Sequence, residues 1–139
     1  MNPKQFLQIG GAVLVLVAVL GFVGVIGPTP ERSIFGSAWY FDDGENWAHL
    51  ILGIVGLIAA FVFPGNIQKP LVMLLGVVGI LVGLYSLIGP VTEGKKLLGA
   101  NLENPADTIL HLAVGAWALW ASMSKKGMAA GSAMRGPSM

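Results

Sequence analysis

Residues 6–26 read FLQIGGAVLVLVAVLGFVGVI, an uncharged apolar stretch long enough to cross a lipid bilayer as a helix. Three further apolar runs follow at residues 47–63, 71–88 and 108–123. Of the 139 residues, 55% are hydrophobic and only 11% are charged, and the mean hydropathy is +0.76. A soluble domain carries about 25% charged residues. We therefore predict an all-α integral membrane protein with four transmembrane helices.

The apolar runs favour helices because they are continuous, whereas the strands of a membrane barrel alternate apolar and polar residues. Residues 6–26 are longer than the apolar part of a secretory signal and end at Gly27-Pro28 without a small-residue cleavage site, so we expect this span to be retained. Small residues inside the spans allow close helix packing in lipid. Those in the first and third spans are Gly10, Gly11, Gly21, Gly24, Gly76, Gly79 and Gly83.

An internal repeat appears when the chain is aligned with itself at an offset of 62 residues, without a gap. The segment Ile26-Gly27-Pro28 falls on Ile88-Gly89-Pro90, and the only two histidines, His49 and His111, fall on each other. We predict two parallel two-helix repeats, at about residues 6–63 and 70–123, related by a pseudo-twofold axis along the membrane normal. Together they would form one transmembrane domain over residues 1–123, with a connector at residues 64–70.

The second span of each repeat begins with a similar polar pattern. Asp42 lies three residues before Glu45, and Asn104 lies three residues before Asp107, which is the spacing of an N-cap residue and its capping-box partner. Pro105 would fill the first helical position. We expect these helices to begin near residues 44 and 105. Helix ends are expected at Gly27-Pro28, Pro64 and Gly89-Pro90.

Charge segregation indicates how the chain crosses the membrane. The N-terminus, the connector and the C-terminal tail carry basic residues without acidic ones, whereas all seven acidic residues lie in or beside the two long loops. The positive-inside rule then places both termini in the cytoplasm and both loops, at residues 28–44 and 91–104, outside. Residues 124–139 would form a basic cytoplasmic tail. Four aromatic residues fit belts at the membrane interfaces: Trp39, Tyr40, Trp47 and Trp120.

Residues 45–53 (ENWAHLILG) and 107–115 (DTILHLAVG) share a His-Leu-x-x-Gly motif that follows an acidic helix start. With this motif in its second and fourth spans, the chain resembles a family of small four-span bacterial membrane proteins of unknown function, over residues 6–123. The resemblance implies a four-helix bundle in a bacterial inner membrane and no assigned activity. The duplication is stricter here than the family pattern requires, and the tail after Ser124 lies outside the resemblance.

His49 and His111 are the candidate functional residues, because ionisable side chains inside a membrane are usually functional. Glu45 and Asp107 precede them by four residues on the same helix faces, so each carboxylate could orient an imidazole as the partner of a ligating histidine does. The two histidines would then suit axial ligation of a haem- or chlorophyll-type tetrapyrrole. Alternatively, each histidine is structural and hydrogen bonds to a loop carbonyl or to its own carboxylate.

Gly53 and Gly115 follow the histidines by one helical turn on the same faces. The absence of a side chain at these positions leaves space for a macrocycle or for a crossing helix. The sequence does not choose between these two occupants.

The chain contains no cysteine, which excludes disulfides, thiolate metal sites and thiol nucleophiles. We expect no metal site and no nucleic-acid partner, although the net charge of +1 by itself argues nothing about nucleic acid. The expected function is that of a non-catalytic accessory or scaffold subunit, in contact with the bilayer and with other membrane protein subunits and without a cofactor. The alternative is a tetrapyrrole-binding protein, and a small ion or proton pathway is third.

Overall fold

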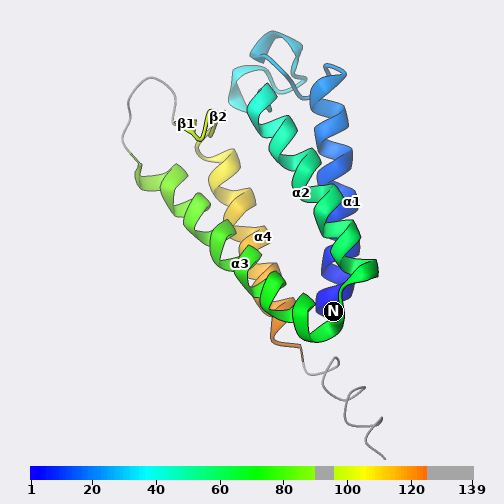
Figure 1. The fold of residues 1–139 in the computed structure, drawn as a ribbon. Coiled ribbons are helices and arrows are strands. Elements are labelled where there is room, and N and C mark those ends of the chain that lie inside the picture. Colours follow the sequence, from blue (N-terminus) through cyan, green and yellow to red (C-terminus); the bar gives the residue numbers. More distant parts are fainter. Residues whose placement is uncertain (90–95, 125–139) are drawn as a thin grey trace, which may run out of the picture.

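The computed structural model describes residues 1–89 and 96–124 of the chain. It contains four helices that run up and down side by side (Figure 1). The elements in chain order are α1 (Pro3–Phe22), η1 (Pro30–Arg32), η2 (Gly36–Ala38), α2 (Asp43–Val62), α3 (Gly65–Ile88), β1 (Lys96–Leu97), β2 (Ala100–Asn101) and α4 (Ala106–Ser122). The two short strands form an antiparallel hairpin in the second loop, and the two 3₁₀ turns lie in the first loop. The architecture is therefore helical, as predicted.

Three helices are long and apolar enough to cross a membrane: α1 and α2 with 20 residues each, and α3 with 24. Helix α4 has 17 residues. Many large apolar side chains on the helix surfaces are exposed, including Ile51, Phe61 and Leu81. A soluble protein would bury such side chains, whereas lipid accommodates them. The structure thus indicates a membrane protein.

Helix α1 ends at Phe22, four residues before the Ile26 expected from the apolar run. Gly24 has a φ of +87°, which glycine adopts without the steric cost that other residues incur. Beyond the helix, the backbone N–H groups of Val25 and Ile26 both donate to the Leu20 carbonyl. The left-handed glycine, and not the following Gly27-Pro28 pair, therefore ends this helix.

The expected connector at residues 64–70 is mostly helical, because α3 begins at Gly65 and contains Pro70. The buried Gln68 secures this tight turn. Its Nε2 atom donates to the carbonyl oxygens of Ala59 at 3.1 Å, Ala60 at 3.1 Å and Phe63 at 2.9 Å. The Ala59 carbonyl also accepts a hydrogen bond from the Phe63 N–H at 3.2 Å. Carbonyl groups at a helix C-terminus lack partners within the helix, and the Gln68 amide supplies a donor to those of Ala60 and Phe63 at the end of α2.

The helices pack as two close pairs: α1 with α2, the first pair, and α3 with α4, the second pair. Glycines allow the backbones to touch in each pair. A Cβ atom added at Gly53 would lie 2.8 Å from the Gly11 carbonyl oxygen, and one added at Gly115 would lie 2.9 Å from the Gly76 carbonyl oxygen. Such contact supplies the van der Waals attraction that holds helices together in lipid.

The buried residues of the two pairs occur at corresponding positions. In the first helices, Pro3, Leu7, Gly11, Ala18 and Gly21 correspond to Gln68, Val72, Gly76, Gly83 and Ser86, which lie 65 residues later. In the second helices, Glu45, Asn46, Gly53, Gly56, Ala59 and Ala60 correspond to Asp107, Thr108, Gly115, Ala118, Ala121 and Ser122, which lie 62 residues later. The first helices therefore match at an offset three residues longer than that of the ungapped sequence alignment.

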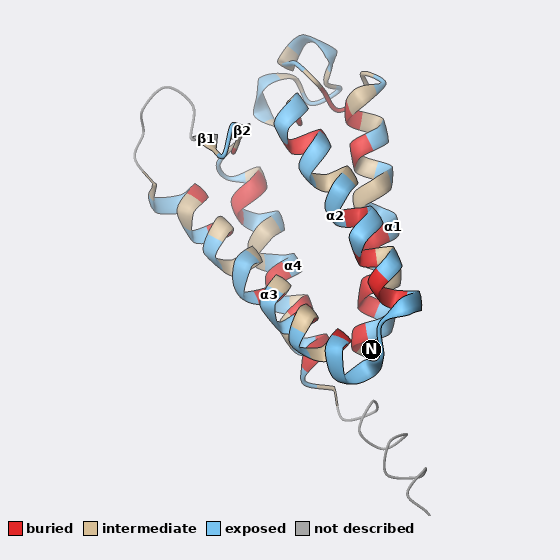
Figure 2. Cartoon of the chain, viewed as in Figure 1, coloured by how far each residue is buried: buried red, intermediate tan, exposed pale blue. Residues whose placement is uncertain are grey.

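The two pairs meet at the end of the molecule that holds the N-terminus, and they diverge toward the loops (Figure 1). Figure 2 shows buried residues inside each pair and at the end where the pairs meet. The shared core consists of Phe6, Leu7, Ala59, Ala60, Val72, Ala118 and Ala121. The Phe6 and Trp117 rings meet edge to face, with centroids 4.6 Å apart, and join α1 to α4.

Candidate functional site

The start of α2 has the predicted capping box. Asp42 Oδ1 accepts a hydrogen bond from the Glu45 backbone N–H at 2.9 Å, and Glu45 Oε2 accepts one from the Asp42 N–H at 3.1 Å. Each carboxylate therefore satisfies a backbone donor that has no partner within the helix. The prediction for this helix start is confirmed.

The start of α4 is built differently, so the prediction of an Asn104 cap is wrong. Pro105 is the N-cap residue, and its backbone (φ −95°, ψ −5°) is not in the extended conformation that side-chain capping requires. Asn104 Oδ1 instead accepts a hydrogen bond from Thr108 Oγ1 at 3.3 Å. Asp107 Oδ2 accepts one from the Glu103 N–H at 2.6 Å, so the carboxylate holds the chain that precedes the helix.

Hydrogen bonds from the two loops join the pairs at the end where the helices diverge. Trp39 Nε1 in the first loop donates to Asp107 Oδ1 at 3.0 Å. The Asn101 N–H in the second loop donates to Asp42 Oδ2 at 2.8 Å, and Asn101 Nδ2 donates to the Tyr40 hydroxyl at 3.1 Å. The sequence did not reveal these links, because Trp39 and Tyr40 fitted an interfacial belt equally well.

Four carboxyl groups gather at this junction, and we call them the carboxyl cluster: Asp42, Glu45, Glu103 and Asp107. Glu45 and Asp107 are 2% and 1% exposed. Burial, together with the neighbouring Asp107, raises the pKa of Glu103 to about 8, so this carboxyl holds its proton at neutral pH. Glu45 Oε1 and Glu103 Oε2 are buried without a hydrogen-bond partner among the described residues.

The two histidines lie one helical turn below Glu45 and Asp107, on α2 and α4. His111 Nδ1 is 2.7 Å from the Asp107 backbone carbonyl oxygen, and because a carbonyl oxygen only accepts, Nδ1 is the donor. His49 packs against the Phe41 ring with centroids 4.8 Å apart, and its Nδ1 is buried without a partner in the described part of the chain. The structure thus places each of the two histidines predicted from the sequence one turn below an acidic residue of the carboxyl cluster.

The sequence suggested that the carboxylates of Glu45 and Asp107 orient the imidazoles. The structure shows a different arrangement. Within residues 1–89 and 96–124, these carboxylates accept hydrogen bonds from Asp42, Glu103 and Trp39 instead. Asp107 contacts the His111 ring through its backbone carbonyl. Four-residue spacing on a helix places a side chain near the backbone carbonyl one turn earlier as well as near the side chain there.

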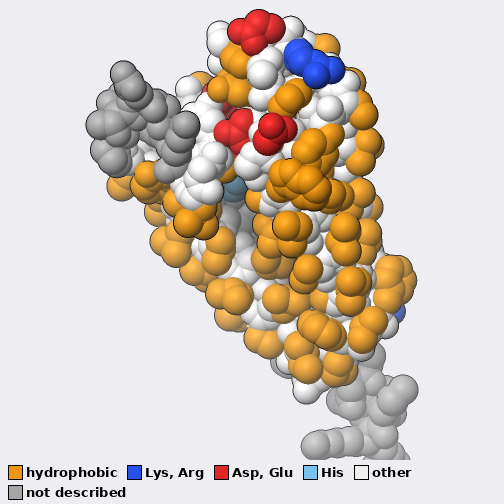
Figure 3. Space-filling model, turned by 45° about the horizontal axis from the view of Figure 1, so that its top comes forward, with side chains coloured by type: hydrophobic (Ala, Val, Ile, Leu, Met, Phe, Trp, Pro, Cys, Tyr) orange, Lys and Arg blue, Asp and Glu red, His pale blue; other side chains and the backbone are white. Residues whose placement is uncertain are grey.

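Below the histidines, the space between the pairs is open. Leu52 and Val114 follow His49 and His111 by three residues on the same helix faces, and they are 48% and 46% exposed. Two turns further along, Ala59 and Ala121 are 1% and 0% exposed. In Figure 3 the surface is hollowed between the pairs, with red acidic side chains and pale-blue histidine surface toward its loop end. We call this space the hollow.

Gly53 and Gly115 do not line the hollow as space for a ligand. Added Cβ atoms would lie 2.8 Å from the Val15 side chain and 2.8 Å from the Ile80 backbone nitrogen, so each glycine faces the first helix of its own pair. Of the two occupants considered for these positions, the structure shows the crossing helix.

The described residues contain no group of three or more histidine and acidic side chains placed to hold a metal ion. Comparisons with protein-family models, with curated proteins and with solved structures find no match for this chain. The resemblance to a four-span bacterial family stays a prediction. The predicted tail at residues 124–139 lies outside the described residues except for Ser124.

Proposed function

We propose that the protein is a non-catalytic accessory or scaffold subunit of a larger membrane assembly, and that the hollow receives an apolar element of a partner. The half-exposed Leu52 and Val114 at the centre of the face between the pairs carry the proposal. In a closed four-helix bundle these positions would be core. Here hydrogen bonds between the loops and an apolar core hold the two ends, while the middle is left open to another helix.

The proposal includes four spans and both termini on the cytoplasmic side of a bacterial inner membrane. At about 1.5 Å per residue, the 17 residues of α4 extend about 25 Å, close to the thickness of the hydrocarbon layer. Helix α4 also lies along α3, which is long enough to span. The matching buried positions support two helix pairs that arose as a repeat. The first helices of the two pairs match at an offset three residues longer than the second helices do.

A tetrapyrrole or similar ring is the second candidate occupant. It is favoured by one observation: the Nδ1 of His111 is held by a backbone carbonyl, which orients Nε2 as in ligating histidines. The buried Nδ1 of His49 has no hydrogen-bond partner among the described residues. If the ring is present, the two imidazoles would be its axial ligands, and the apolar sides of the hollow would exclude water.

A double substitution, His49→Gln with His111→Gln, separates the two proposals. Glutamine keeps a hydrogen-bond donor and acceptor, but it does not replace an imidazole as an axial ligand. The accessory subunit is expected to be colourless and to retain the same co-purifying membrane subunits in wild type and variant. An absorption band near the Soret region that disappears in the variant would overturn the accessory proposal in favour of the ring.

A matched control is Gln8→Leu in α1, a half-buried amide outside the carboxyl cluster and the hollow. Loss of partners in both variants would indicate general damage to the fold, which circular dichroism reveals directly. If wild-type protein, purified gently, is a colourless monomer without partners, the accessory proposal fails.

A further inference from the structure

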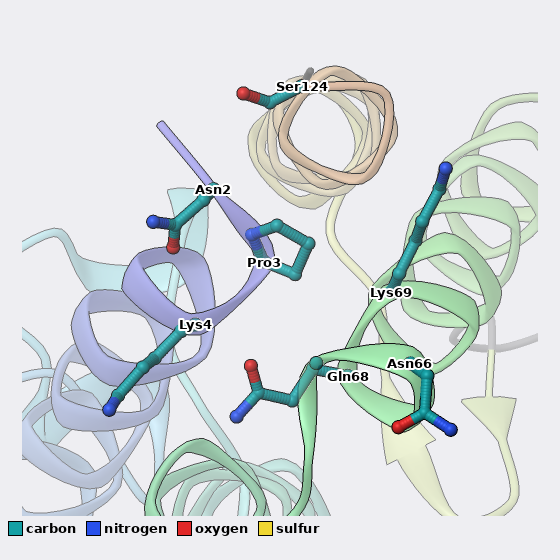
Figure 4. A pocket seen from close by; sticks show the side chains of 8 residues that line it. Asn2, Pro3, Lys4, Asn66, Gln68, Lys69 and Ser124 are labelled. Carbon is teal, nitrogen blue, oxygen red and sulfur yellow. The ribbon is translucent and has the colours of Figure 1, made fainter. Parts of the chain in front are cut away.

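At the opposite end of the molecule from the carboxyl cluster lies a pocket of about 350 Å³. It is bounded by the starts of α1 and α3 and by Ser124, two residues after the end of α4 (Figure 4). Its polar lining consists of Asn2, Lys4, Asn66, Gln68, Lys69 and Ser124. The volume falls in the range of small-molecule sites, about 300–1,000 Å³.

The electrostatic field in this pocket is positive. Lys4 and Lys69 lie on opposite sides of it (Figure 4), and within the described residues neither forms an ion pair. The acidic residues that the structure describes lie in the loops or in the first turns of α2 and α4, at the other end of the molecule, so none of them neutralises these lysines locally. The starts of two helices add the positive ends of their dipoles, and the N-cap residue of α3, Pro64, supplies no side-chain cap.

The pocket lies at the level where an apolar interior gives way to polar residues. On one side is the shared core, which includes Phe6 and Val72. One turn beyond Lys69 on the same face of α3, Met73 is exposed, and Ile9 is exposed beyond Lys4 on α1. An anion in the pocket would therefore have lysine amines around its charged part and apolar helix surface beside it.

We infer that this pocket binds the phosphate headgroup of an anionic glycerophospholipid, with the acyl chains lying along the exposed apolar faces of α1 and α3. Basic sites between transmembrane helices on the cytoplasmic side bind such headgroups, since the charge attraction and the apolar contact act together. The bound lipid would contact both pairs beside their shared core. This inference does not depend on what occupies the hollow.

The test uses the full-length protein in nanodiscs of phosphatidylcholine with one-tenth phosphatidylglycerol, and native mass spectrometry to count retained lipids. We expect retained phosphatidylglycerol. Lys4→Gln or Lys69→Gln should each lower the affinity about fivefold and the double variant about 25-fold, which is the effect expected for single lysines near an anionic surface. Lys4→Arg with Lys69→Arg should restore retention, because arginine keeps the charge.

Arg32→Gln, which removes one positive charge from the first loop, is the matched control and should leave retention unchanged. Both lysines also contribute to orientation, so a Ser37→Cys reporter is labelled from outside in each variant to confirm an unchanged topology. Equal retention of the two lipids, or unchanged retention in the double glutamine variant, would overturn the inference. A soluble-anion site would be indicated, and the inference overturned, if inorganic phosphate binds in pure phosphatidylcholine nanodiscs while the mixed nanodiscs show no retained phosphatidylglycerol.

Discussion

Replacement of Gly53 by alanine tests the close helix contact within the first pair. The added Cβ would lie 2.8 Å from the Gly11 carbonyl oxygen, 2.8 Å from a Val15 methyl group and 2.9 Å from the Val15 backbone nitrogen. Two of these atoms belong to the backbone and do not rotate away, so the helices must separate. Over-packing of this kind costs about 1–3 kcal/mol.

Gly56→Ala is the matched control, because Gly56 lies one turn further along α2 and is also buried. Its added Cβ would meet its nearest neighbours at 3.7 Å and 3.8 Å, which is ordinary van der Waals contact. Both substitutions gain the same helix propensity, about 1 kcal/mol in soluble peptides, so that term cancels between them. Gly53→Ala should therefore be less stable than Gly56→Ala by about 1–3 kcal/mol.

The assay is equilibrium unfolding in mixed micelles with increasing dodecyl sulfate, followed by tryptophan fluorescence and circular dichroism. Gly115→Ala should behave as Gly53→Ala does, because its Cβ would lie within 2.9 Å of backbone atoms on α3. If Gly53→Ala is as stable as Gly56→Ala, the backbone contact between α1 and α2 does not hold the pair together as described.

Three further predictions concern the ends of the molecule. Because the pKa of Glu103 is raised in the folded protein, the free energy of unfolding should fall as the pH rises from about 4.5 to about 8. Glu103→Gln should weaken this dependence in pH-series unfolding measurements, and an unchanged profile would contradict the assignment. Gln68→Leu should destabilise the protein by about 1–3 kcal/mol, because carbonyls at the end of α2 lose their donor, whereas Gln8→Leu should have little effect in the same assay. Trp39→Phe keeps an aromatic ring but loses the hydrogen bond to Asp107, so hydrogen exchange at the start of α4 should accelerate; unchanged protection would contradict this link.

The local signals in the sequence were sufficient for the helices and for one of the two caps. Continuous apolar runs predicted the positions of the helices, and the spacing of Asp42 and Glu45 predicted the capping box. The same spacing failed at Asn104, because Pro105 lies at the N-cap in a helical conformation and leaves no extended residue there. A spacing rule therefore holds only where the backbone can adopt the geometry that the rule assumes.

The contacts between distant residues could not be predicted in the same way. The links from Trp39 to Asp107 and from Asn101 to Asp42 join residues 68 and 59 positions apart. Their partners depend on how the pairs diverge, and periodicity along one helix does not contain that information. The histidines were found because they are the only two in the chain, whereas the hollow below them follows from the angle between the pairs.

Photo-crosslinking from the hollow tests the central proposal most directly. A photoreactive amino acid is placed at Leu52 or at Val114, and the matched control position is Ile54, which is similarly exposed but lies on the opposite face of α2. In native membranes the account predicts a protein adduct of one discrete mass from both hollow positions and lipid adducts from Ile54. Lipid adducts alone from all three positions would contradict the proposal that a partner subunit occupies the hollow.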